Sequence, residues 1–213
     1  MKQSFLEFVT GGSWSGNLLM LVLFALSIVA VYIFAERIII LQKTKKEIQS
    51  FVKNMHGLIS NNKLNESMDL VQNHDSIAAI VLRKSLQTIG KRDIGINEAN
   101  LVIDTIGNNE ITQLEKGFSM LASIAGGAPM IGFLGTVIGM VQAFYEMSAQ
   151  EGGSFEVAAL SQGIYTAMFT TVGGLAVGII AYFAYNYLIS RLKRITIALE
   201  AVKIDYIELR NHQ

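Results

Sequence analysis

Four threonines lie in two long stretches of the chain that carry no charged side chain. The stretches run from Gly117 to Tyr145 and from Val157 to Ser190. The four residues are Thr136 in the first stretch and Thr166, Thr170 and Thr171 in the second. A hydroxyl inside a membrane helix most often bonds a carbonyl of its own helix, so one threonine alone indicates little. Three on one helix and one on another favour a polar interior that could line a path for water or protons.

Small residues accompany these threonines at helical spacing. Gly132, Gly135 and Gly139 fall on one helix face of the first stretch, and Gly174 and Gly178 lie in the second. Lipid supplies no hydrophobic force between helices, and small residues let helix backbones approach closely enough to associate. We therefore expect these glycines to pack against other helices.

The only proline of the chain, Pro129, lies inside the first stretch. It removes one amide donor and frees the carbonyl of Ala125, which predicts a bend or a carbonyl in contact with water. The residues leave open whether this bend serves function or packing alone. We assign Pro129 to helix packing together with the glycines.

Neither stretch contains an Asp, Glu, Lys or His residue. A proton path needs titratable groups or a chain of water, so a partner would have to bring the acid. Glu36 is the one carboxylate inside an apolar segment, and the adjacent Arg37 favours an ion pair at the membrane interface. The chain has no cysteine, nucleophile constellation, metal-ligand spacing or phosphate-binding loop. We expect no enzyme activity, no cofactor, no metal and no nucleic acid partner.

Three segments are long and apolar enough to cross a bilayer, which takes about 20 residues. Lysines and arginines follow the first and third segments, and the loop between the second and third carries glutamates without a cation. Because cations mark the cytoplasmic side, this places the N-terminus outside and the C-terminus inside. The predicted fold is an all-α integral membrane protein with three transmembrane helices and long cytoplasmic helical extensions. Its predicted segments are an outer N-terminal segment (1–16), transmembrane helices at 17–41, 117–146 and 158–190, a cytoplasmic helical region (42–116), a short outer loop (147–157) and a cytoplasmic helical tail (191–213).

The polar segments also show helical periodicity. Asn62 is predicted to cap one short helix, and Ser76 to cap another that ends near Gly90. From about Asn97 the pattern runs into the second span without a breaker, which predicts one long helix. In the tail, apolar residues alternate spacings of four and three, which predicts a packing seam either within one subunit or between subunits. The seam residues are Leu188, Leu192, Ile195, Leu199, Val202, Tyr206 and Leu209.

The stretches LEKGFSMLASIAGGAPMIGFLGTVIGMVQAF, from Leu114 to Phe144, and GIYTAMFTTVGGLAVGIIAYFAYN, from Gly163 to Asn186, resemble the MotA/TolQ/ExbB proton-channel family, with ExbB as the most similar branch. Three spans and the ERIIIL run from Glu36 to Leu41 agree with ExbB and TolQ. The resemblance implies a bacterial inner-membrane location with a periplasmic N-terminus. It also implies a homo-oligomeric ring, five subunits in ExbB-like proteins, around single-span helices of an ExbD-like partner. The partner's Asp would carry the proton, and the work would pass to a TonB-like protein that energises outer-membrane transport.

Within that resemblance, Thr136 and Thr171 match the family positions that face the partner's Asp. Many ExbB and TolQ proteins have Glu where this chain has Thr166, and Pro where it has Ile180. Thr166 and Thr170 could hold water in place of that acid. A TolQ-like or gliding-type envelope motor, or a membrane scaffold that conducts nothing, stays open beside the ExbB-like function.

Overall fold

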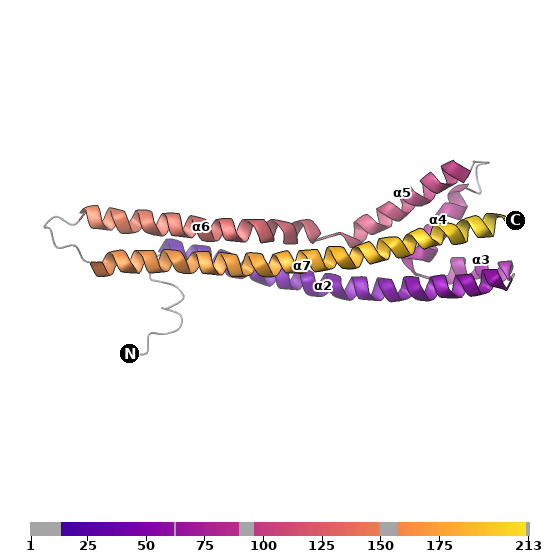
Figure 1. Cartoon of the computed structure of the whole chain (residues 1–213), viewed down its shortest axis with the longest axis horizontal. Coiled ribbons are helices and arrows are strands. Elements are labelled where there is room, and N and C mark those ends of the chain that lie inside the picture. Colours follow the sequence, from indigo (N-terminus) through magenta and orange to yellow (C-terminus); the bar gives the residue numbers. More distant parts are fainter. Residues whose placement is uncertain (1–13, 62, 90–95, 150–156, 212–213) are drawn as a thin grey trace. The chain divides into compact units, whose positions relative to one another are not determined.

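The computed structural model describes residues 14–61, 63–89, 96–149 and 157–211, and all regular secondary structure in these residues is α-helical (Figure 1). The prediction of an all-α protein is confirmed. Most of the predicted N-terminal segment lies outside the described residues, as do residues 150–156 of the predicted outer loop, whereas 147–149 belong to the helix before it and 157 to the helix after it. The helices are α2 (Trp14–Ser60), α3 (Leu64–Asn73), α4 (Ile77–Ile89), α5 (Ile96–Leu114), α6 (Phe118–Ala149) and α7 (Val157–Asn211).

Three of these helices are long and apolar enough to cross a membrane, as the sequence predicts. The candidate spans are Gly16–Ser60 in α2, Phe118–Ser148 in α6 and Gly163–Ala201 in α7. A single crossing takes about 20 residues. The 47 residues of α2 and the 55 of α7 therefore extend well beyond one crossing.

The chain divides into two compact units. Unit 1 comprises Met1–Phe34 and Gly117–Asn186, and so contains the first part of α2, all of α6 and the first part of α7. Alanines account for many of its buried apolar residues, and many of its large apolar side chains are exposed, as in a helix bundle whose surroundings are apolar. The buried residues include Ala128, Ala143, Ala167 and Ala181, and the exposed ones include Phe24, Phe133, Val172 and Phe183.

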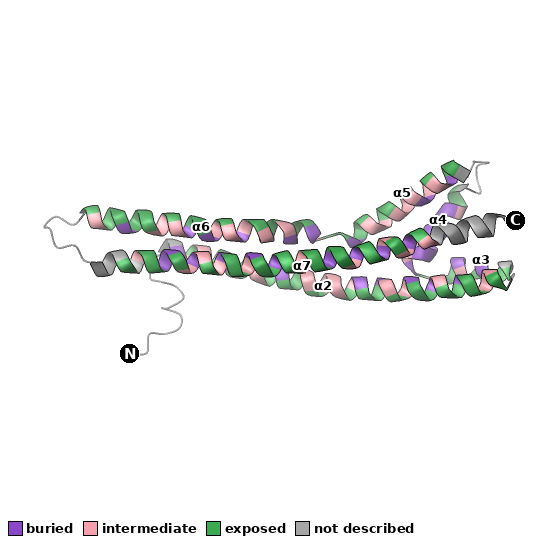
Figure 2. Ribbon diagram, viewed as in Figure 1, coloured by how far each residue is buried: buried purple, intermediate pink, exposed green. Residues whose placement is uncertain are grey.

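Unit 2 comprises Ala35–Lys116 and Tyr187–Gln213 and has a core of large aliphatic and aromatic side chains. Leu41, Ile48, Phe51 and Met55 of α2 are buried in it. The first four residues of the tail seam, Leu188, Leu192, Ile195 and Leu199, are buried as well and recur along α7 between exposed residues (Figure 2). The seam is thus covered within one chain. The side chains of Val202, Tyr206 and Leu209 lie outside the described part.

The short helices of unit 2 test the predicted caps. Ser76 Oγ accepts a hydrogen bond from the Ala79 amide at 3.2 Å, which confirms the cap of α4. The cap predicted at Asn62 is wrong. Helix α3 begins at Leu64 with Lys63 in the N-cap position and without a side-chain cap, and Lys63 instead forms an ion pair with Glu66 one turn later. Asn62 and Gly90 lie outside the described residues.

The prediction of one continuous helix from Asn97 into the second span is also wrong. Helix α5 ends at Leu114, residues 115–117 form a turn, and α6 begins at Phe118. Gly117 has a φ of 83°, in the left-handed region that an L side chain rarely adopts. The apolar period continues through this turn, but the backbone does not continue as a helix, because glycine lets it leave the helical conformation.

Candidate functional site

Helices α6 and α7 of unit 1 pack antiparallel through their glycines. A Cβ atom placed on Gly132 would lie 2.8 Å from the Thr170 carbonyl oxygen, and one on Gly174 would lie 2.5 Å from the Ala128 carbonyl oxygen. Further along the contact, a Cβ on Gly139 would lie 2.8 Å from the Ala167 Cβ. Real Cβ atoms do not approach other heavy atoms so closely. The absence of side chains at these positions therefore sets the distance between the helices.

The same contact holds Gly135 and Gly178. A Cβ on Gly135 would lie 2.8 Å from the Thr170 Cβ, and one on Gly178 would lie 2.5 Å from the Pro129 Cγ. A Cβ at Gly178 would also lie 3.1 Å from the carbonyl oxygen of Ala125, which the proline leaves without its helical donor. The structure thus places Gly178 directly over Pro129 and the carbonyl that it frees.

Two hydroxyls of α7 reach the carbonyl oxygen of Gly132 on α6. Thr171 Oγ1 donates to it at 3.0 Å, and Thr170 Oγ1 lies at 3.3 Å. Thr170 Oγ1 also lies 2.7 Å from the Ala167 carbonyl oxygen of its own helix. A threonine hydroxyl has one proton to donate, so the shorter contact takes most of the Thr170 bond. Thr171 therefore makes the main hydrogen bond between the two helices at this point.

Thr136 lies one turn from Gly132 on α6 but is not part of that hydrogen-bond cluster. Its Oγ1 donates to the Phe133 carbonyl oxygen at 2.5 Å, within its own helix, and the side chain is partly exposed on the surface of the subunit. A hydroxyl whose proton is committed to a carbonyl keeps its lone pairs as acceptors. Thr136 can thus accept a hydrogen bond from a group outside the subunit.

The remaining predicted residues lie in two places. Thr166 is buried in unit 1, one turn before the fully buried Thr170. Glu36 and Arg37 lie in unit 2, where Arg37 Nη2 is 3.5 Å from Glu36 Oε1. The Arg37 side chain is 14% exposed against 39% for Glu36, so the guanidinium is directed inward. Among the residues that the structure describes, no group of three His, Cys, Asp or Glu side chains could hold a metal ion.

Sequence reasoning missed two features of this site. It identified the threonines but not the Gly132 carbonyl on which two of them converge, because a carbonyl has no signature in the sequence. It also missed that Gly178 covers Pro129. The spacing of Gly174 and Gly178, one turn apart, was a usable signal for a contact surface. It did not indicate which residues of α6 lie opposite.

Comparison with known proteins covers most of the chain. The sequence pattern of the MotA/TolQ/ExbB proton channel family matches residues 73–201, more than half of the length. The chain belongs to this family. The matched region includes the whole α6·α7 contact, so the glycines and threonines described above are part of the family region.

Individual relatives of this MotA/TolQ/ExbB-family protein differ in their named systems. It is 28% identical to the biopolymer transport protein ExbB of Neisseria meningitidis serogroup A over 202 residues, covering 88% of this chain and 89% of that relative. It is 27% identical to the Tol-Pal system protein TolQ of Haemophilus influenzae over 212 residues, covering 95% and 89%. An ExbB homologue of Methanothermobacter thermautotrophicus is 39% identical over 83 residues, and the chain spans only 28% of that protein.

Membership establishes the general class of the protein. It is a membrane protein of a proton-channel family that transduces energy in the cell envelope and works with partner proteins. The two relatives that are covered over most of their length carry an ExbB name and a TolQ name at nearly equal identity. The sequence match by itself does not separate the two systems.

Proposed function

We propose that this protein is the channel subunit of an inner-membrane proton motor that works with an ExbD-like partner to energise a TonB-like protein for outer-membrane transport. The observation that carries the proposal is the orientation of two hydroxyls, that of Thr171 at the α6·α7 contact and that of Thr136 on the partly exposed surface of α6. Thr171 donates to the Gly132 carbonyl and Thr136 to the Phe133 carbonyl, so both present lone pairs rather than protons. These residues lie in charge-free spans of a proton-channel family member.

Acceptor hydroxyls suit a carboxyl group that alternates between two protonation states. A protonated carboxyl can donate to either threonine, whereas an ionised carboxylate only accepts and needs a donor. To serve the carboxylate, Thr171 or Thr136 must turn its proton away from the carbonyl that it now binds. Where Thr171 is the group that turns, proton loss from a partner's Asp would break the hydrogen bond between α7 and the Gly132 carbonyl of α6. This gives a physical link between proton transfer and helix movement.

The proposed assembly has a homo-oligomeric ring, five subunits by analogy with ExbB-like proteins, around the partner's single spans. The N-terminus would lie in the periplasm and residues 42–116 and 191–213 in the cytoplasm, as the distribution of cations favours. The large apolar side chains exposed on unit 1 support a membrane-embedded surface shared by lipid and neighbouring helices. Thr166 and Thr170 would lie beside the path, with Thr170 held mainly by carbonyls.

A TolQ-like role is the second candidate, because the TolQ relative aligns over 95% of this chain. The two roles differ in the partner and in the process that fails without the protein. Deleting the gene and measuring both energy-dependent uptake through outer-membrane receptors and leakage of the outer membrane would separate them. Lost uptake with an intact barrier supports the TonB-type role, and a leaky barrier with normal uptake supports the Tol-type role. Normal uptake and an intact barrier together would contradict both.

A further inference from the structure

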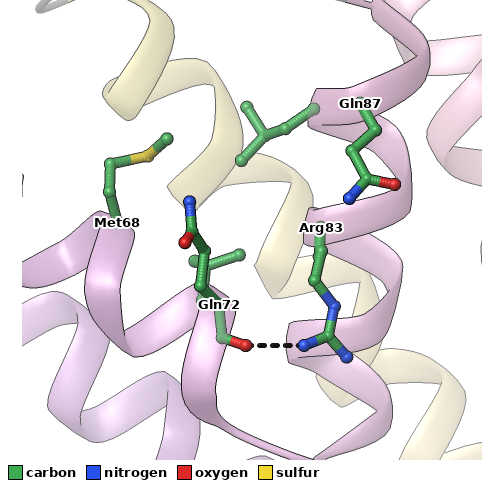
Figure 3. Close-up of a pocket in the computed structure, with 6 residues that line it drawn as sticks. Met68, Gln72, Arg83 and Gln87 are labelled. Carbon is green, nitrogen blue, oxygen red and sulfur yellow. Dashed lines mark hydrogen bonds between the residues drawn. The ribbon is translucent and has the colours of Figure 1, made fainter.

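Unit 2 contains a pocket between α3 and α4 that is lined by both apolar and polar side chains. Its volume is about 320 Å³, within the size range of ligand-binding pockets. Figure 3 shows the arrangement of the polar side chains around it. Three apolar and three polar side chains line the pocket: Met68, Val71, Leu86, Gln72, Arg83 and Gln87.

Arg83 gives this pocket a positive charge in a fixed position. Its Nη1 donates to the Gln72 carbonyl oxygen at 2.6 Å, near the end of α3, and this bond orients the guanidinium (Figure 3). A guanidinium has five N–H donors, so most remain available for an acceptor. Within the described residues, no ion pair joins Arg83 to a carboxylate, whereas the adjacent Lys84 pairs with Glu110. The pocket therefore suits a ligand that combines an apolar side chain with a carboxylate.

Helix α5 presents that combination on its surface. Leu101 is 66% exposed and is the one exposed large apolar side chain among the described side chains of α3, α4 and α5. Glu98 lies three residues earlier on α5 and is exposed as well, so the two side chains are neighbours on one helix face. An exposed leucine beside an acidic residue matches the apolar side chains and the guanidinium of the pocket.

Leu101 cannot fill the pocket of its own chain. The Lys84–Glu110 ion pair aligns the pocket residues of α4 with the part of α5 near Glu110. Leu101 lies nine residues before Glu110, so it is roughly 14 Å from Glu110 along the axis of α5 at the rise of an α-helix. The leucine and the pocket are thus separate surfaces of one subunit, and only another chain can bring them together.

We propose that Leu101 of one copy inserts into the α3·α4 pocket of a second copy, with Glu98 paired to Arg83. Such a contact joins two different surfaces of the same protein. A head-to-tail contact of this kind generates a ring where the rotation between successive copies closes, and an open filament where it does not. The proposal concerns the polar helices outside the membrane and does not depend on whether the protein conducts protons.

Directed disulfide formation tests this contact, because the chain has no cysteine of its own. Two differently tagged full-length copies are expressed together in membranes, one with Leu101→Cys and the other with Met68→Cys, and then oxidised. We expect a covalent dimer that carries both tags. The matched control replaces Leu101→Cys by Thr112→Cys, an exposed residue eleven positions further along α5. It should give no such dimer. Copies that co-purify without the Leu101–Met68 cross-link would overturn the proposal, as would copies that do not co-purify.

The charge pair is tested in the same cysteine background. Arg83→Glu and Glu98→Arg should each reduce the yield of cross-linked dimer several-fold, and combining them in the two copies should restore most of it. Unchanged yields in both single variants, or no recovery in the combination, would contradict the Glu98–Arg83 pairing. With the single-span partner co-expressed and carrying an introduced cysteine, a cross-link from Met68→Cys to that cysteine in place of the one to the second copy would assign the pocket to the partner and overturn the proposal.

Discussion

The Thr171 hydroxyl of α7 donates a hydrogen bond to the Gly132 carbonyl of α6 at 3.0 Å, at a point where a Cβ on Gly132 would lie 3.1 Å from the Thr171 Cα. The bond forms only because glycine lets the two backbones approach so closely. Hydrogen bonding and close packing therefore depend on each other at this contact. A change that separates the helices also breaks the bond that orients Thr171.

The first prediction concerns the backbone approach itself. Gly174→Ala places a Cβ 2.5 Å from the Ala128 carbonyl oxygen and 2.8 Å from the Gly132 Cα. Neither backbone atom can move without shifting a helix, so we expect a loss of about 1–3 kcal/mol in the free energy of unfolding. Gly126→Ala is the matched control, since a Cβ there meets nothing within 4 Å. Denaturant titration of the purified protein in detergent would measure both, and equal stability of the two variants would refute the packing account.

The second prediction separates the two adjacent hydroxyls. Thr171→Val removes the main hydrogen bond between α7 and α6. The Thr170 hydroxyl donates mainly to the Ala167 carbonyl of its own helix, so Thr170→Val removes mostly a bond within α7. Hydrogen bonds between membrane helices average about 0.6 kcal/mol, with a maximum near 1.7 kcal/mol. We expect Thr171→Val to lower the free energy of unfolding by an amount in this range, about 0.6–1.7 kcal/mol. In the same titration, Thr170→Val should lower the free energy of unfolding by less than Thr171→Val does. A larger loss for Thr170→Val would contradict the conclusion that Thr171 makes the main hydrogen bond between the helices.

The third prediction couples Pro129 to Gly178. A Cβ on Gly178 would lie 2.5 Å from the Pro129 Cγ, so Gly178→Ala should be destabilising while the proline ring is present. In a Pro129→Ala background the proline ring is absent, so Gly178→Ala should lower the free energy of unfolding by less. For residues in contact the coupling energy is about 0.5–3 kcal/mol. A double-mutant cycle on unfolding free energies measures it, and additive effects would show that the two residues do not constrain each other.

The fourth prediction concerns Thr166, where the resemblance to ExbB and TolQ proteins implies a Glu in many of them. Thr166 is buried one turn before Thr170 and supplies a hydroxyl instead of an acid. If that hydroxyl holds water beside the path, Thr166→Val should reduce proton flux that depends on the ExbD-like partner, and Thr166→Ser should retain it. Flux into vesicles containing the purified complex would be measured. Unchanged flux in Thr166→Val removes this residue from the path.

Sequence periodicity predicted the contact surface of α6 and α7 but not its register. A spacing of three and four residues identifies which side chains share a helix face, such as Gly132, Gly135 and Gly139. It does not say that Gly132 lies opposite Thr171, because that depends on how two helices slide along each other. The hydroxyls were likewise identifiable as polar groups in an apolar setting. Their acceptors could not be predicted, since backbone carbonyls depend on the tertiary arrangement.

The errors in the polar region have a common physical cause. Apolar periodicity runs through residues 115–117, so the pattern predicted a continuous helix, but Gly117 adopts a left-handed conformation that ends it. A charged pair followed by glycine, Glu115-Lys116-Gly117, was an available signal for a helix end. At α3, the prediction relied on the capping preference of Asn62. The helix begins two residues later, where the ion pair between Lys63 and Glu66 stabilises the first turn.

The central claim, that Thr136 and Thr171 face a partner's proton-carrying group, is tested most directly by proton flux. The protein is co-expressed with its ExbD-like partner, and the complex is purified and placed in vesicles with an imposed proton gradient. We predict that Thr136→Val and Thr171→Val each abolish most of the partner-dependent flux while the complex keeps its size and composition. Full flux in both variants, with assembly intact, would contradict the account and leave these hydroxyls as packing residues.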